Sequence, residues 1–154
     1  MKLKLLSFAL LIVVGFITCT KSSYNTTPTL KFVGVNNTVI PQQAPLSFEL
    51  ECTDKEGDVV DTIWIERVSK VSGCTYLSRI DSFPIPDFNP PKNVKVEFDF
   101  DYNYASNIPP NLAGCSIGSG QSATDTSYFR FWMHDRAQHV SDTVQSPDIT
   151  LLKQ

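Results

Sequence analysis

The segment from Asn93 to Tyr104 alternates strictly between apolar and polar side chains, and this pattern limits the possible folds more than any other feature of the sequence. Every second position is apolar: Val94, Val96, Phe98, Phe100, Tyr102 and Tyr104. The positions between them are polar: Asn93, Lys95, Glu97, Asp99, Asp101 and Asn103. A period of two places these sets on opposite faces of a strand, whereas a helix would mix them. We therefore predict a long strand with one buried face.

Further segments with strand patterns are separated by turn-forming residues. Alternation predicts strands from Leu46 to Thr53 and from Thr126 to Asp135. The segment Val59–Val68 is predicted to be a strand with both faces covered, because Ile63, Trp64 and Ile65 are three consecutive apolar residues. Shorter candidates are Leu30–Val35, Thr75–Phe83 and Val144–Leu152. No segment carries a helical apolar stripe, and about seven strands in a chain of this length predict an all-β antiparallel β-sandwich. The Pro-, Gly-, Asn- and Ser-rich stretch Ser106–Gln121 is predicted to be an excursion rather than a strand.

The N-terminus has the pattern of a secretory signal peptide. Lys2 and Lys4 precede an apolar run, Leu5–Ile17, that is too short to span a bilayer comfortably. Cys19 follows at the boundary with polar residues, and a cysteine at this place resembles the lipobox of bacterial lipoproteins. In that family the cysteine thiol is acylated and the chain is cut just before the cysteine. Thr18 departs from that motif, where Gly, Ala or Ser is usual. Cleavage by the general signal peptidase and an uncleaved membrane anchor are the alternatives.

These features predict three parts: a lipoprotein signal peptide (1–18), a flexible tether (19–28) and a β-sandwich domain (29–154). Acyl chains on Cys19 would anchor the protein to a membrane, since each buried CH₂ contributes about 0.8 kcal/mol. We therefore expect a lipid-anchored protein of the bacterial cell envelope, at the outer membrane. The formal charge of the whole chain is −3, and removing residues 1–18 takes away two lysines and no acid, so a nucleic-acid partner is not expected.

Two short motifs make the chain resemble small immunoglobulin-like lipoproteins of Bacteroidetes bacteria. That family commonly has an Asp-Gly-Asp-Gly-Asp loop after its second strand, where this chain has Asp54-Lys55-Glu56-Gly57-Asp58, and an Asp-Arg-Ala-Gly-Asn turn near the C-terminus, where this chain has Asp135-Arg136-Ala137-Gln138-His139. Both motifs have lost glycines here. The resemblance covers most of residues 28–152 and implies an immunoglobulin-like β-sandwich and an envelope location. The family is largely of unknown function, so it implies no activity.

Three cysteines remain if Cys19 carries the lipid, and an odd number in an oxidising compartment leaves one unpaired. Cys52 lies on the apolar face of its strand and is predicted to be a buried thiol. Cys74 and Cys115 each follow a glycine in loop-like sequence, and pairing them would pin the long excursion to the domain. We predict the Cys74–Cys115 disulfide, with Cys52–Cys74 as the alternative.

Asp54, Glu56 and Asp58 place three carboxylates within five residues. Hard cations such as Ca²⁺ bind where several oxygens converge from one flexible loop. In a sandwich the loop after the second strand and the loop before the last strand lie at the same end of the domain, so Asp135 could join these three carboxylates. Asp54, Glu56, Asp58 and Asp135 are therefore candidate ligands of a possible Ca²⁺ site. The alternative is an ordinary solvated turn, because Lys55 adds a positive charge and because Asp and Gly favour turn geometry without an ion.

No strong catalytic motif is present, and we expect no enzymatic activity. His134 and His139 could hold a transition metal only if a third ligand joined them, and they are better read as polar surface residues. No Gly-x-Ser-x-Gly elbow exists. The outward acids Glu97, Asp99 and Asp101 could supply a glycoside-hydrolysing pair, but acids alternating with aromatics are what the exposed face of an antiparallel strand normally carries.

Aromatic side chains on an exposed sheet face could stack on sugar rings. Trp64, Tyr128 and Trp132 are the candidates if they point outward, and core packing is the competing reading for them. The sequence thus predicts a cell-envelope lipoprotein that acts as a non-catalytic binding or structural module, with an envelope protein or a glycan as its partner. The alternative is a glycan-binding accessory lipoprotein, and a hydrolase is more distant.

Overall fold

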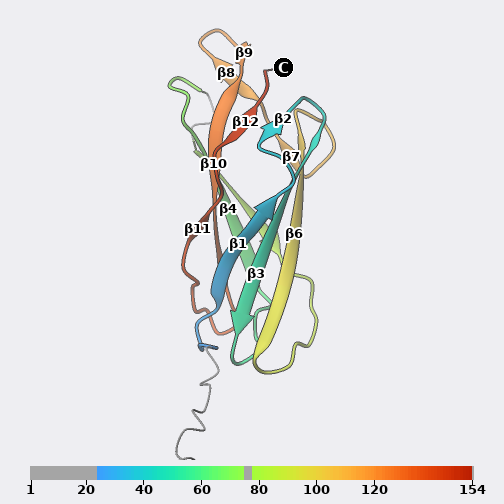
Figure 1. Cartoon of the computed structure of the whole chain (residues 1–154), viewed down its shortest axis with the longest axis vertical. Helices are drawn as coiled ribbons and strands as arrows, with labels where there is room; N and C mark the ends of the chain where they lie inside the picture. Colours follow the sequence, from blue (N-terminus) through green and yellow to red (C-terminus); the bar gives the residue numbers. More distant parts are fainter. Residues whose placement is uncertain (1–23, 75–77, 154) are drawn as a thin grey trace, which may run out of the picture.

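The computed structural model describes residues 24–74 and 78–153, which form twelve strands and, within these ranges, no helix. The strands make two facing sheets and one small hairpin (Figure 1). The predicted signal peptide and Cys19 lie outside the described residues. No helix in the described part is long and apolar enough to cross a membrane.

The first sheet has four strands in the order β1-β3-β6-β7. Their bounds are Thr29–Val35 (β1), Pro45–Asp54 (β3), Val94–Tyr104 (β6) and Asn111–Leu112 (β7). The first three are antiparallel neighbours, and β7 pairs with β6 in parallel. Strand β6 has the predicted alternation: its apolar side chains face the core or its margin, and the charged residues between them are exposed.

The second sheet has the order β2-β12-β10-β4-β5, with β11 beside β10. Its strands are Val39–Ile40 (β2), Thr62–Ser69 (β4), Ser78–Pro84 (β5), Asp125–His134 (β10), Val144–Gln145 (β11) and Ile149–Leu151 (β12). All pairs except β12·β2 are antiparallel. The order β1-β3-β6 opposite β12-β10-β4-β5 is the order of strands A-B-E opposite G-F-C-C′ in immunoglobulin domains, so the predicted fold class is confirmed.

All of the predicted strands are present within the described residues, outside which the first three residues of the predicted strand Thr75–Phe83 lie. The count of about seven was too low, and the prediction that Ser106–Gln121 contains no strand was wrong. This stretch contains β7, and β8 (Cys115–Ile117) pairs with β9 (Gln121–Ala123) as the separate hairpin. Strands of two or three residues are too short to show a period of two, so their sequences read as loop. The predicted last strand is also divided, into β11 and β12.

The core lies between the two sheets and is rich in aromatic rings. The ring of Phe48 on β3 lies 4.8 Å from that of Phe129 and 5.1 Å from that of Phe131, both on β10. All three side chains are buried. On β4 the prediction of two covered faces was only half right, because Ile63 and Ile65 are buried in the core whereas Trp64, between them, lies half-buried on the outer face.

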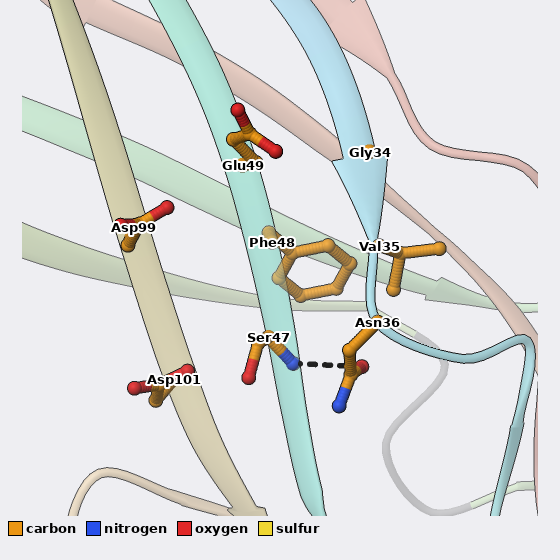
Figure 2. A pocket seen from close by; sticks show the side chains of 8 residues that line it. All are labelled: Gly34, Val35, Asn36, Ser47, Phe48, Glu49, Asp99 and Asp101. Atoms are coloured by element: carbon orange, nitrogen blue, oxygen red, sulfur yellow. Dashed lines mark hydrogen bonds between the residues drawn. The ribbon is translucent and has the colours of Figure 1, made fainter.

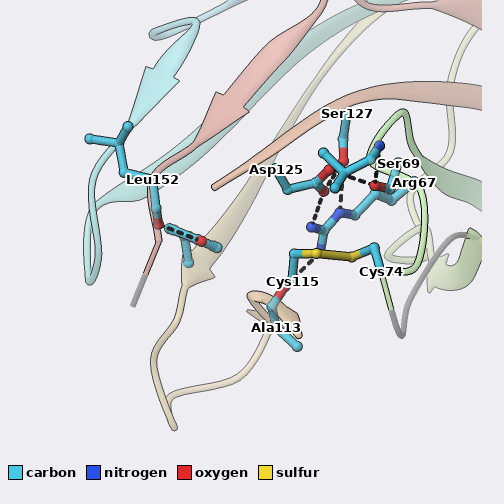
Figure 3. Close-up of a disulfide and its surroundings, with 10 residues drawn as sticks. Arg67, Ser69, Cys74, Ala113, Cys115, Asp125, Ser127 and Leu152 are labelled. Atoms are coloured by element: carbon cyan, nitrogen blue, oxygen red, sulfur yellow. Dashed lines mark hydrogen bonds and ion pairs between the residues drawn. A yellow bond between two sulfur atoms is a disulfide. The ribbon is translucent and has the colours of Figure 1, made fainter. Parts of the chain in front are cut away.

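The predicted disulfide between Cys74 and Cys115 is confirmed and ties β8 to the turn after β4 (Figure 3). Beside it, the guanidinium of Arg67 is buried and donates to a carboxylate oxygen of Asp125 at 2.5 Å and to the carbonyl oxygen of Ala113 at 2.5 Å. Ser69 and Ser127 donate their hydroxyls to the same carboxylate. The excursion is therefore held to the domain by a covalent bond and by a buried polar network.

Cys52 is a free, fully buried thiol in the core, as predicted. Burial raises its pKa to about 12, and the carboxylates of Asp54 and Asp135 add to the shift. An immunoglobulin-type bridge across the sheets would need a cysteine on β10, but the core positions of that strand carry Phe129, Phe131 and Met133. Cys52 therefore behaves as a small apolar side chain.

Candidate functional sites

Three of the four predicted cation ligands converge at one end of the sandwich. Asp54 is the last residue of β3, Asp58 lies in the loop that leads to β4, and Asp135 follows β10 directly. One carboxylate oxygen from each lies within 4.8 Å of the others. Glu56 is exposed and is not a member of this group. We call Asp54, Asp58 and Asp135 the acidic cluster.

Backbone geometry in the loop after β3 holds the acidic cluster together. The Oδ1 atom of Asp54 accepts hydrogen bonds from the backbone N–H groups of Gly57 at 2.5 Å and Asp58 at 3.4 Å. Gly57 has a φ of +76°, and a Cβ there would lie 2.4 Å from the Pro91 carbonyl oxygen, so the turn requires glycine. The backbone N–H of Arg136 donates to the carbonyl oxygen of Asp58 at 2.8 Å, which joins the two loops.

The acidic cluster buries negative charge. Asp54 and Asp135 have no exposed surface, and burial raises the pKa of the Asp54 carboxyl, with the nearby charges of Asp58 and Glu56 acting in the same direction. Asp135 accepts hydrogen bonds from the backbone N–H of His139 at 2.7 Å and pairs with its ring Nδ1 at 2.8 Å. This contact raises the pKa of His139. Neither Asp54 nor Asp58 forms an ion pair within the described residues.

The two histidines are not brought together as a metal pair. The ring of His139 contacts Asp135, whereas the ring of His134 lies 6.2 Å from that of Trp64 on the outer face of the second sheet. Neither belongs to a group of potential metal ligands in the described part of the chain.

The predicted aromatic residues share the outer face of the second sheet. Trp64 on β4 and Trp132 on β10 are directly opposite each other, and their rings are nearly parallel, at 5°, with centroids 6.4 Å apart. Tyr128 lies four residues from Trp132 on the same strand face, which is about 13 Å along the strand. All three side chains are half-buried. We call this the tryptophan face.

Polar groups surround the aromatic rings of the tryptophan face. Arg130 lies between Tyr128 and Trp132, pairs with Glu66 at 3.4 Å, and has its guanidinium 5.3 Å from the centre of the Tyr128 ring. Lys70 approaches the same ring at 5.7 Å. An open hollow beside these groups is lined by Glu66, Arg130, Trp132, Val140 and Thr143. The Nε1 atom of Trp64 is buried and has no hydrogen-bond partner. The face thus combines flat apolar rings with polar groups.

The acids considered for glycoside hydrolysis lie on the opposite outer face, that of the first sheet. Glu97, Asp99 and Asp101 are exposed along β6. Figure 2 shows Asp99 opposite Glu49 of β3 and Asp101 opposite Ser47, around a shallow pocket whose other wall is the end of β1. This face is open to solvent, whereas a general acid depends on a sheltered environment to raise its pKa.

Comparison with known proteins identified neither a family model nor a curated protein that matches the chain. Among solved structures, the sporulation control protein Spo0M from Bacillus subtilis aligns with 83% of this chain and 50% of its own, at 8% identity and a TM-score of 0.42. A β-glucosidase from Listeria innocua, in complex with gluconolactone, aligns with 81% of this chain and 16% of its own, at 8% identity and a TM-score of 0.41. The chain therefore spans half or less of these structures, and similarity at this level carries no functional argument.

Proposed function

We propose that this protein is a non-catalytic binding or structural module of the bacterial cell envelope, anchored by lipid on Cys19. The tryptophan face is the observation that carries the proposal. It presents Trp64 and Trp132 on the outer surface of the sheet, next to the charged pair formed by Glu66 and Arg130. Binding surfaces are enriched in aromatic residues and arginine, and half-buried rings lose little conformational freedom on contact with a partner.

The envelope location is supported by three independent features. The basic start, short apolar run and Cys19 form a lipoprotein signal, and the two short motifs resemble those of Bacteroidetes lipoproteins. The Cys74–Cys115 disulfide is typical of proteins that fold in an oxidising compartment.

The location is tested by replacing the lipidated residue. Cys19→Ser should move the protein from the membrane fraction to the soluble fraction or to an unprocessed precursor. Metabolic labelling with a clickable fatty acid should mark the wild type and leave the variant unlabelled. Cys52→Ser is the matched control and should remain labelled. A wild-type protein that carries no label would refute the anchoring proposal.

Glycan binding is the second candidate, and the parallel rings of Trp64 and Trp132 favour it because sugar rings stack on flat aromatic surfaces. Titration of the protein with a panel of envelope and dietary oligosaccharides tests it. Trp132→Ala should weaken any binding at least tenfold, whereas Ile108→Ala, at an exposed apolar residue remote in sequence, should not change it. Binding that is insensitive to Trp132→Ala would place the ligand elsewhere. A Trp132→Ala variant that no longer captures an envelope protein, while no glycan binds, would favour the protein partner.

A further inference from the structure

The acidic cluster lies at the end of the sandwich where the tether joins the domain. In Figure 1 the described N-terminal residues and the end of β3 are at the bottom of the molecule, and β12 is at the top. The backbone contact between Asn25 and Lys55 places the start of the described chain next to the same loop that carries Asp54 and Asp58. We infer that Asp54, Asp58 and Asp135 bind a Ca²⁺ ion at this end of the domain.

Two buried oxygen atoms without a partner point to a missing ligand. Oδ2 of Asp54 and Oδ1 of Asp58 are inaccessible to solvent, and neither has a hydrogen-bond partner. The loop N–H groups bind Oδ1 of Asp54, so they fix the carboxylate while its other oxygen stays available. Buried polar atoms in folded proteins nearly always have a partner, and an unpaired buried oxygen indicates an ion or water that belongs there.

The surrounding basic side chains do not compensate this charge. Lys55 is exposed and forms no ion pair with the acidic cluster. Arg136 pairs instead with Asp87 at 2.9 Å. His139 pairs directly with the Asp135 carboxylate and interacts with Asp58 only at longer range, so neither Asp54 nor Asp58 has an ion-pair partner among the described residues. Three carboxylates that share a buried space repel one another strongly unless a cation lies between them.

The spacing and chemistry of the ligands fit Ca²⁺ better than other metals. Oxygens bound to Ca²⁺ lie about 2.3–2.6 Å from it, so two of them on opposite sides of the ion are up to about 5.2 Å apart. The oxygens of the acidic cluster lie within 4.8 Å of one another. Zinc and copper prefer nitrogen and sulfur, and Mg²⁺ requires oxygens at about 2.0–2.1 Å in a strict octahedron. Because Ca²⁺ takes six to eight oxygens, water would complete the shell.

A cation at this position would connect the two sheets. Asp54 belongs to β3 of the first sheet, and Asp135 follows β10 of the second. The loop after β10 is already joined to the loop before β4 by two hydrogen bonds, from the Arg136 backbone N–H to the Asp58 carbonyl oxygen and from the Gln138 side-chain amide to Asp61 at 2.8 Å. Ca²⁺ would therefore act as a clamp that stiffens the base of the domain, next to the tether.

Thermal unfolding and calorimetric titration of the purified protein test this inference. At free Ca²⁺ of about one hundred times the dissociation constant, the unfolding midpoint should rise by about 10 °C over that in chelator. Mg²⁺ at the same concentration should give a much smaller rise. Asp58→Asn keeps the side-chain shape and removes one charged ligand, so it should weaken Ca²⁺ binding at least tenfold.

Glu56→Gln is the matched control, because it removes a carboxylate from the same loop but not from the acidic cluster. It should bind Ca²⁺ within twofold of the wild type. The inference is overturned if the folded wild type binds no Ca²⁺ at millimolar concentration, or if Glu56→Gln abolishes binding as fully as Asp58→Asn. Asp58 is only half-buried, so its Asn variant should fold even if Asp54→Asn or Asp135→Asn does not.

Discussion

Removal of the Cys74–Cys115 disulfide should destabilise the domain by about 4 kcal/mol. The two cysteines are 41 residues apart in the sequence, and closing a loop of that length removes unfolded-state entropy worth about 4 kcal/mol at 25 °C. The folded state should persist without the bond, because Arg67 still donates to the Ala113 carbonyl and β7 still pairs with β6. The loss should therefore appear as lower stability of an intact fold.

The double variant Cys74→Ala, Cys115→Ala tests this value without leaving unpaired thiols. Urea unfolding at pH 7, followed by tryptophan fluorescence, should show the loss of free energy, and the thermal midpoint should fall by about 10–15 °C. Reductant should lower the wild-type midpoint to that of the variant and leave the variant unchanged. A loss below about 1 kcal/mol would refute the loop-closure argument. A variant that is unfolded in buffer would mean that the bond is needed to hold the native excursion in place.

Three further predictions concern a buried thiol, a buried ion pair and the turn at Gly57. The Cys52 thiol, with a pKa of about 12, should react with iodoacetamide at pH 8 at least a hundredfold more slowly in the folded protein than in urea, and its rate should rise with pH well beyond pH 9. Arg67→Met should lower the free energy of unfolding in urea by about 3–5 kcal/mol, because the buried carboxylate of Asp125 loses its partner. Adding Asp125→Leu to this variant should recover part of that free energy. Gly57→Ala should lower the thermal midpoint by several degrees, because the new Cβ would contact the Pro91 carbonyl oxygen; an unchanged midpoint would show that the turn can relax.

The sequence predicted the long strands well because each buries one face. Along β6, apolar and polar positions alternate over the whole strand, and the structure turns the apolar set towards the core. On β10 the inward residues Phe129, Phe131 and Met133 are buried in the core, as the alternation predicts. Residues 106–121 could not be predicted in the same way. Strands β8 and β9 have three residues each, which is too few to show a period of two.

The candidate sites were predicted to different degrees. Local spacing placed Asp54 and Asp58 in one loop, and the topology of a sandwich brought Asp135 to them. Spacing could not exclude Glu56, because the direction of a side chain in a turn depends on backbone angles such as the positive φ of Gly57. The buried Arg67 was missed altogether, although it follows Ile63 and Ile65 on the inward face of β4.

The entry of the chain into β1 has a mechanical consequence. The tether end and β12 lie at opposite ends of the sandwich, and β1 pairs with β3 from Thr29 opposite Thr53 to Val35 opposite Phe48. A pull on the tether, opposed by a load at the far end, acts along β1 and perpendicular to these hydrogen bonds. The bonds of the ladder must then stretch together rather than open one after another. A domain loaded in this shear direction resists mechanical rupture more strongly than one that is peeled apart from its edge.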